Sequence, residues 1–259
     1  MNVETDVVLM MTASVDPKGM PAAATVADPH RREADYLGAL RYYLTNHPLV
    51  RRIVFAENSG WPLEKFRQLA GRHLAKEVEF LSFELNDFPR ELGKSYGEML
   101  LMDHIFQHSK LIGQTRYVAK ITGRNYLINL TDMLESAPTS LQFYGDLRDH
   151  SIYQWLGTQW SGAHGESRFF VTTPEFYNRY FRDQYRFLDD RVQGEMMEDL
   201  IYRVVKQSLG EPGVIGRFRK EPSFRGLAGH LGKDYGSPAE LAKQAIRRMT
   251  RKLTPWLWV

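Results

Sequence analysis

The sequence contains no cysteine, which excludes disulfide bonds and thiolate metal sites and favours a reducing compartment. It also has no apolar run that approaches the ~18 residues of a membrane-spanning helix. The 34 Lys and Arg residues nearly balance the 31 Asp and Glu residues, so the formal net charge of +3 gives no strong field for nucleic acid. The N-terminus lacks a basic segment before its first apolar run, which argues against a secretion signal. We therefore expect a cytoplasmic protein.

The remaining composition is that of a globular protein, with 43% hydrophobic residues in a chain of 259. Dominant disorder is excluded, and no repeat, low-complexity tract or linker interrupts the chain. We expect a single domain over residues 1–259. Within it, the glycine-rich segment 210–237 is interpreted as a loop-rich lid, and 241–259 as a basic amphipathic tail.

Strand and helix patterns alternate along the first half of the chain. Short apolar runs bounded by turn residues predict buried strands at 7–13, 52–56, 78–83 and 117–121. Apolar residues at helical spacing predict helices at 34–45, 62–73 and 96–108. This alternation predicts an α/β fold with a Rossmann-type, mostly parallel central sheet flanked by helices.

The second half of the chain is less regular. Its patterns predict strands at 140–144 and 168–173, and helices at 174–180 and 195–209. A Trp- and Gly-rich stretch, 155–162, separates the two strands.

A small cationic loop follows the predicted strand at 117–121. Lys120 and Arg124 flank the turn made by Thr122 and Gly123. Exposed backbone N–H groups, a hydroxyl and two fixed positive charges suit a diphosphate. Ligands of open α/β sheets bind at the carboxyl ends of the strands, where this loop is expected. The alternative is that both charges are simply solvated at a strand end.

Four short motifs give the sequence a family resemblance. ENSG (57–60), KSYGEM (94–99), HSK (108–110) and KITGR (120–124) occur in this order. In motifs and element order, the chain from 7 to 209 resembles bacterial glycosyltransferases of the GT-A fold that build surface polysaccharides such as lipopolysaccharide and capsule. The resemblance implies a GT-A-like fold and transfer of a sugar from a nucleotide-sugar donor to a hydroxyl of a glycan or glycolipid acceptor.

The resemblance also implies which residues contact the donor. The loops after the first, second and fourth strands, the start of the 96–108 helix and the lid would contribute, with Tyr36 as an aromatic neighbour. The implied donor-binding residues are Thr12, Ala13, Asp28, Arg31, Glu57, Asn58, Ser59, Lys94, Lys120, Thr122, Gly123, Arg124, His230 and Lys233. Plain turn and helix-start roles are the alternatives for Asp28, Arg31 and the ENSG motif, and a surface position is the alternative for His230.

The family's metal-binding Asp-x-Asp motif is absent. KITGR stands in the corresponding place, so the resemblance implies that Lys120 and Arg124 take over the charge of the metal on the leaving diphosphate. We therefore expect no metal cofactor. Asp146, Asp149 or Glu166 could still supply a ligand for Mn²⁺ or Mg²⁺.

An inverting transferase needs a carboxylate that takes the proton of the acceptor hydroxyl. The resemblance implies such a base at the start of a late helix, where Glu198 and Asp199 stand. They point about 100° apart, so only one can face a cleft. Asp146 is the second candidate base. The alternative for the acidic pair is a solvated first turn that complements the helix dipole.

The C-terminal tail carries Lys and Arg residues followed by Trp256 and Trp258. This pattern suits an anionic membrane surface, so we expect peripheral association with the inner membrane face; docking on the protein core is the alternative.

The rival function is a non-catalytic nucleotide- or RNA-binding protein, which the missing RNA-binding motifs disfavour. A phosphate-ester hydrolase would need metal-binding carboxylates that the sequence does not assemble.

Overall fold

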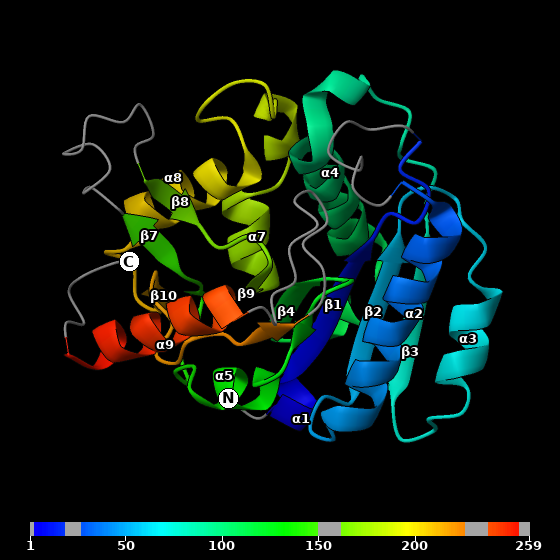
Figure 1. Ribbon diagram of the computed structural model, residues 1–259, viewed down its shortest axis with the longest axis horizontal. Helices are drawn as coiled ribbons and strands as arrows, with labels where there is room; N and C mark the ends of the chain where they lie inside the picture. The colour runs from blue at the N-terminus through cyan, green and yellow to red at the C-terminus, as the bar shows by residue number, and fades with distance from the viewer. Residues whose placement is uncertain (1–2, 19–26, 150–161, 226–237, 254–259) are drawn as a thin grey trace.

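The computed structural model describes residues 3–18, 27–149, 162–225 and 238–253 (Figure 1). His230, Lys233 and the tryptophans of the tail lie outside the described residues. The predicted assignments for these positions therefore stay predictions.

The centre of the molecule is a seven-stranded mixed sheet with the order β10-β6-β9-β4-β1-β2-β3. β1 pairs in parallel with β2 on one side and with β4 on the other, while β9 runs antiparallel to both of its neighbours. The strands are β1 (Val7–Ala13), β2 (Arg52–Glu57), β3 (Glu77–Ser82), β4 (Tyr117–Thr122), β6 (Phe143–Tyr144), β9 (Phe169–Thr172) and β10 (Val214–Ile215).

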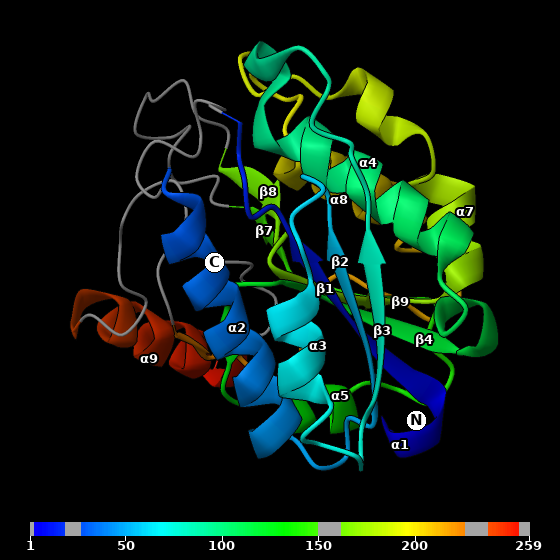
Figure 2. The same ribbon diagram turned by 90° about the vertical axis from the view of Figure 1, so that its right-hand side faces the viewer.

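Helices cover both faces of this sheet. α2 and α3 pack on one face, and α4, α7 and α8 on the other (Figure 2). None of the helices in the described ranges has the length and apolar character of a membrane span. The helices are α1 (Val3–Asp6), α2 (Pro29–Asn46), α3 (Glu64–Ala70), α4 (Gly93–His108), α5 (Leu130–Glu135), α7 (Pro174–Tyr180), α8 (Met197–Ser208) and α9 (Pro238–Leu253).

Smaller elements complete the described fold. β5 (Tyr126–Leu127) pairs with β11 (Phe224–Arg225), and β7 (Leu147–Asp149) pairs with β8 (Ala163–Gly165), each as an antiparallel ribbon. Short 3₁₀ turns occur at η2 (Arg90–Leu92), η3 (Ile112–Gln114) and η4 (Gln184–Phe187).

The burial of β1 explains why this strand could be predicted from the sequence. All seven of its residues are buried. Leu9 and Met11 face the core under α2 and α3, whereas Val8 and Met10 face the core under α4. A strand covered on both faces needs a continuous apolar run, which is the pattern of the sequence. The predicted bounds of this strand and the predicted fold class are confirmed.

Other predicted bounds need correction. α2 begins earlier than predicted because the Asp28 side chain accepts a hydrogen bond from the His30 N–H and Pro29 occupies the first turn. The segment predicted as a loop-rich lid contributes two strands within its described part. Val214–Ile215 forms an edge strand of the main sheet, so this part is structural.

The order of the strands defines one special crevice. The chain runs outward from β1 through β2 to β3, and then returns to pair β4 on the opposite side of β1. Connections therefore leave the carboxyl ends of β1 and β4 in different directions. Open α/β sheets bind their ligands at such a topological switch point.

Candidate active site

The loops after β1 and β4 touch at this switch point. Thr12 and Thr122 are paired in register, and the Gly123 N–H donates to the Thr12 carbonyl over 2.9 Å. A Cβ at Gly123 would lie only 2.5 Å from that carbonyl oxygen. Glycine is therefore required for the two loops to approach so closely.

Lys120 does not project from the loop as the sequence suggested. It is fully buried in β4, and its side chain points to the α4 face of the sheet like that of Val118. Its ammonium lies 2.6 Å from a Glu98 oxygen and donates to the Thr122 hydroxyl over 3.0 Å. It also donates to the Ser167 carbonyl over 2.5 Å. The expectation of an accessible cation at this position is therefore corrected, because β4 alternation turns Lys120 inward.

Glu98 of α4 is the partner that organises this end of β4. Besides the Lys120 contact, its carboxylate accepts from the Thr12 hydroxyl over 2.9 Å and from the Thr122 hydroxyl over 3.3 Å. Burial alone would raise the pKa of Glu98, but Lys120 and the hydrogen bonds lower it below its usual value. The side chain is still 23% exposed, so an ionised carboxylate reaches the surface of the crevice.

A second ion pair lies beside the first. Lys94, one helical turn before Glu98, has its ammonium 3.5 Å from a Glu198 oxygen. The Ser167 hydroxyl donates to the same oxygen over 2.8 Å, so Ser167 contacts Lys120 through its carbonyl and Glu198 through its hydroxyl. Burial would lower the pKa of Lys94, but Glu198 and Glu98 raise it. Lys94 therefore stays charged at neutral pH.

Glu198 keeps one oxygen unused. Its Oε2 atom is buried and has no hydrogen-bond partner among the described residues. An unpartnered carboxylate oxygen is costly unless a ligand or a proton donor completes it. This makes Glu198 the candidate base with an acceptor position to offer.

The two other candidate bases are held by structural contacts. Asp199 accepts a hydrogen bond from the Met196 N–H over 3.2 Å and so caps the start of α8. Asp146 is 1% exposed, and Arg251 donates to its two oxygens over 2.9 and 2.6 Å. Asp146 is therefore closed to an acceptor, whereas Asp199 is half-buried like Glu198 and uses one of its oxygens as the cap.

The ENSG motif builds the loops around the site. The carboxylate of Glu57 is fully buried and accepts from the N–H groups of Val15, Ser59 and Trp61, each over 2.9 Å. Burial raises the pKa of Glu57, although these hydrogen bonds oppose the shift. Asn58 is also buried and has an unpartnered Oδ1. Glu57 and Ser59 therefore tie the loop after β2 to the loop after β1.

Arg124 is the cation of the KITGR motif that retains unused donors. It lies over the ring of Tyr36, 5.7 Å from its centroid, and its buried Nε and Nη1 atoms have no hydrogen-bond partner in the described part of the chain. The Tyr36 hydroxyl accepts from the Ser14 N–H over 3.0 Å, which places both side chains beside the end of β1. Arg124 therefore meets the requirements for binding an anion at the switch point.

The remaining predicted donor-binding residues in the described ranges are exposed at the start of α2 or buried in β1. Asp28 is exposed and caps α2, and Arg31 is exposed on the same helix. Ala13 is buried at the end of β1. The neighbouring Arg32, which the sequence reading passed over, is buried and donates to the Ser14 carbonyl over 2.8 Å.

Two side chains of the candidate site, Glu98 and Ser167, are not among the residues predicted from the sequence, because their partners are remote in sequence. A carboxylate near the start of a helix, such as Glu98, is also what the helix dipole favours, so its type alone does not mark it. The KSYGEM and KITGR motifs each contained one half of the Glu98–Lys120 pair. A search for opposite charges between these motifs would have found it.

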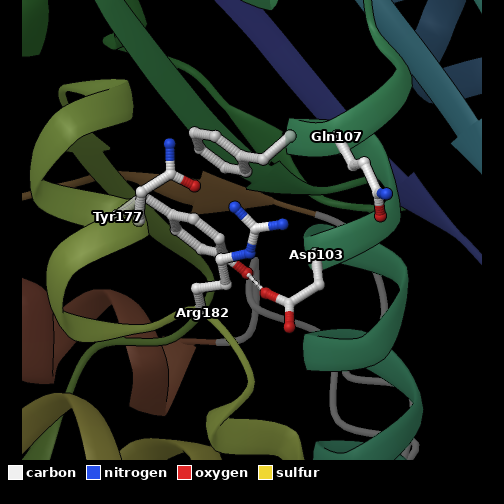
Figure 3. A pocket seen from close by; sticks show the side chains of 6 residues that line it. Asp103, Gln107, Tyr177 and Arg182 are labelled. Carbon is white, nitrogen blue, oxygen red and sulfur yellow. Dashed lines mark hydrogen bonds between the residues drawn. The ribbon is translucent and has the colours of Figure 1, made fainter.

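A separate hollow lies between α4 and α7, with the side chains of Asp103, Gln107, Tyr177 and Arg182 around it (Figure 3). Its volume is about 250 Å³. The Tyr177 hydroxyl donates to Asp103 over 2.5 Å, and the Asp183 N–H fills the other Asp103 oxygen over 2.8 Å. Asp103 lies on the last turns of α4, whereas Lys94 and Glu98 lie on its first turns. The hollow is therefore separate from the switch-point site.

The sequence predicts a metal site only as the alternative to charge stabilisation by Lys120 and Arg124. Within the described ranges, no three His, Asp or Glu side chains form a group that could hold a metal. Of the alternative ligands, Asp146 and Glu166 pair with arginines, and Asp149 accepts from the Tyr202 hydroxyl over 2.9 Å. Metal dependence stays a question for experiment.

No protein-family model and no curated protein matches this sequence. Among solved structures, the chain is similar to core-mannan synthase A from Aspergillus fumigatus, with 11% identity and a TM-score of 0.48 over 96% of this chain and 85% of the other. A protein assigned as a glucose-1-phosphate thymidylyltransferase from Bacillus anthracis shares 10% sequence identity with this chain at a TM-score of 0.48. The match covers 93% of this chain and 95% of that protein. The bifunctional glycosyltransferase WbbM shares 11% sequence identity with this chain at a TM-score of 0.44. The match covers 77% of this chain but only 37% of WbbM. These values assign no family.

Proposed function

We propose that the protein is a nucleotide-sugar-dependent glycosyltransferase that transfers a sugar to a hydroxyl of a glycan or glycolipid in surface polysaccharide synthesis. Two observations carry the proposal: among the described residues, a buried Glu198 oxygen and two buried guanidinium nitrogens of Arg124 have no hydrogen-bond partner. A base and an anion-binding group are the two functions that sugar transfer from a diphosphate requires.

The donor side of the proposal rests on Arg124. Its free N–H groups can bind a phosphate oxygen through charge-assisted hydrogen bonds, while the Tyr36 ring fixes the guanidinium. Lys120 is buried and paired, so its role is to hold Glu98 and the loop after β4. The two cations of the KITGR motif thus have different tasks.

The acceptor side of the proposal rests on Glu198. Its carboxylate takes the proton of the acceptor hydroxyl as the acceptor oxygen bonds to the anomeric carbon. The bond from that carbon to the diphosphate breaks, its electrons go to the leaving phosphate, and Arg124 stabilises the new charge. Attack opposite the leaving group inverts the anomeric configuration. Ser167 fixes the orientation of Glu198, and Lys94 forms an ion pair with the same carboxylate oxygen.

We propose that no metal is needed, because Arg124 supplies positive charge and no Asp-x-Asp motif is present. Transfer should then survive excess chelator. Loss of activity with chelator, and its recovery on adding Mn²⁺ or Mg²⁺, would contradict this part of the proposal without removing the rest.

The proposal is tested with a panel of nucleotide-sugars. A ligand at a hundred times its dissociation constant raises the free energy of unfolding by about 2.7 kcal/mol, which a thermal-shift assay detects. Ligands that bind are then incubated with sugar acceptors, and release of nucleoside diphosphate is measured. Binding of nucleotides without any turnover would favour the non-catalytic nucleotide- or RNA-binding alternative. No binding at all would contradict the proposal.

The acceptor hydroxyl is proposed to belong to a glycan or a lipid-linked glycan, so the enzyme would work beside an anionic membrane. The basic composition of α9 and the two tryptophans of the sequence after it support this part of the proposal.

A further inference from the structure

α9 contacts the protein body through its polar side. The Arg251 guanidinium donates to Glu221 over 2.6 Å as well as to Asp146, and its side chain is only 7% exposed. One and two turns earlier, Arg247 is half-buried and Gln244 is buried, with Gln244 accepting from the Ser223 hydroxyl over 3.3 Å. The side of the helix that meets the protein is therefore charged and hydrogen-bonded.

The apolar side of the same helix faces outward. Ile246 is 60% exposed, Met249 is 61% exposed and Leu253 is 66% exposed. Their spacing of three and four residues puts them on one face of the helix. A helix at the surface of a protein in water usually has the reverse arrangement, with its apolar face buried and its charges outside. The outward apolar face of α9 therefore needs a partner.

The charges around this apolar face have one sign. Arg248 and Lys252 are exposed, and the sequence from Gln244 to its end contains no acidic residue. The sequence that follows α9 adds Trp256 and Trp258. Two copies of the chain that met through this face would bring positive charges together, which is unfavourable. An anionic surface with an apolar interior would complement both features.

We infer that the outward face of α9, formed by Ile246, Met249 and Leu253 with Arg248 and Lys252, docks on an anionic lipid surface. The inference deepens the membrane association within the proposed function, and it requires no turnover. Arg251 is removed from the predicted membrane-binding set, because its charge is used to attach α9 to the protein body. The two alternatives for the tail are thus combined: the polar side docks on the protein, and the apolar side is left for the membrane.

The test uses the full chain and sedimentation with phosphatidylcholine vesicles, with and without phosphatidylglycerol. Two double variants separate the contributions: Ile246→Ser with Met249→Ser removes apolar surface, and Arg248→Gln with Lys252→Gln removes charge. The matched control is Leu74→Ser, because Leu74 is 92% exposed in the turn after α3. We expect binding only to the anionic vesicles, weakened about tenfold or more by each double variant and unchanged in the control.

Sedimentation velocity and turnover separate the competing outcomes. Vesicle binding that neither double variant weakens overturns the inference. A wild-type dimer that the Ser variant dissociates, without any vesicle binding, would assign the face to a second copy instead. Turnover with a soluble acceptor should be unchanged in all variants. Failure of the wild-type chain to bind anionic vesicles, with transfer intact, would therefore contradict only this inference and not the proposed transfer reaction.

Discussion

Two clusters of buried charge lie in this molecule, and they differ in how far they reach the surface. In the cluster at the switch point, the side chains of Lys94, Glu98 and Glu198 are 38%, 23% and 26% exposed. In the cluster beneath α9, the side chains of Asp146 and Glu166 are only 1% and 4% exposed. The first cluster is open to a ligand, whereas the second is closed by its own ion pairs.

The two clusters also differ in how their charges are paired, although the Arg148 Nε atom of the closed cluster likewise has no hydrogen-bond partner among the described residues. Arg148 lies 3.2 Å from one Glu166 oxygen, and Arg168 donates to both oxygens of this carboxylate. Burial alone would raise the pKa of Glu166, but Arg168 and Arg148 hold it well below its usual range. At the switch point, Glu198 and Arg124 keep atoms without partners. Closed pairing joins segments of the fold, and incomplete pairing leaves groups for chemistry.

The largest expected effect is on catalysis in the open cluster. Glu198→Gln keeps the shape of the side chain but removes its ability to accept a proton, so turnover should fall about 10²- to 10⁴-fold. Nucleotide-sugar affinity, measured by calorimetry, should be retained. The matched control is Glu195→Gln, an exposed residue just before α8.

The outcomes for the other candidate bases sharpen the same test. Near-normal turnover in Glu198→Gln, with loss in Asp199→Asn, would move the base to Asp199. A product that keeps the donor's anomeric configuration would contradict the inverting mechanism altogether.

The next effect is on stability in the closed cluster. Asp146→Ala removes one of the two buried carboxylates that each of Arg251 and Arg148 contacts, leaving Glu221 and Glu166 as their remaining partners. Breaking a buried ion pair costs about 3–5 kcal/mol of the free energy of unfolding. Urea denaturation measures this change. Asp132→Ala is the control, since its pair with Lys220 is exposed and should contribute about 0–1 kcal/mol. Equal small effects for both variants would show that the closed cluster does not stabilise the fold.

The sequence predicted the elements of the fold better than the partners within it. Buried strands such as β1 are continuous apolar runs, so they are visible locally. The two-residue strand β10 lies in a glycine-rich segment and has no local signal. Ion pairs are set by tertiary structure: Glu98 and Lys120 come from a helix and a strand, and Arg251 meets Asp146 only when α9 docks. Residue types at the site could be predicted, but their division into open and closed clusters could not.

A smaller effect distinguishes the two cations of the KITGR motif. Arg124→Ala should weaken binding of a nucleoside diphosphate about 10- to 100-fold while leaving nucleoside binding nearly unchanged, because a charge-assisted contact contributes about 1.5–3 kcal/mol. Calorimetry with both ligands measures the difference. Arg116→Ala removes the same side chain from the exposed position just before β4 and serves as the control. Equal losses for the two ligands would reject Arg124 as a phosphate-binding residue.

The smallest expected effect is the pH dependence of stability that Glu98 contributes. Its pKa in the folded protein lies below the usual value of 4.5, because Lys120 and its hydrogen bonds outweigh burial. The stabilisation is therefore complete above the pKa of the unfolded chain and is lost as pH falls through the folded pKa. In urea denaturation from neutral pH down through the acid range, the stability difference between wild type and Glu98→Gln should shrink. Glu166→Gln should show the same sign, since the pKa of Glu166 is also lowered. A difference that stays constant with pH for Glu98→Gln, but not for Glu166→Gln, would mean that only the closed cluster holds its carboxylate in the ionised form.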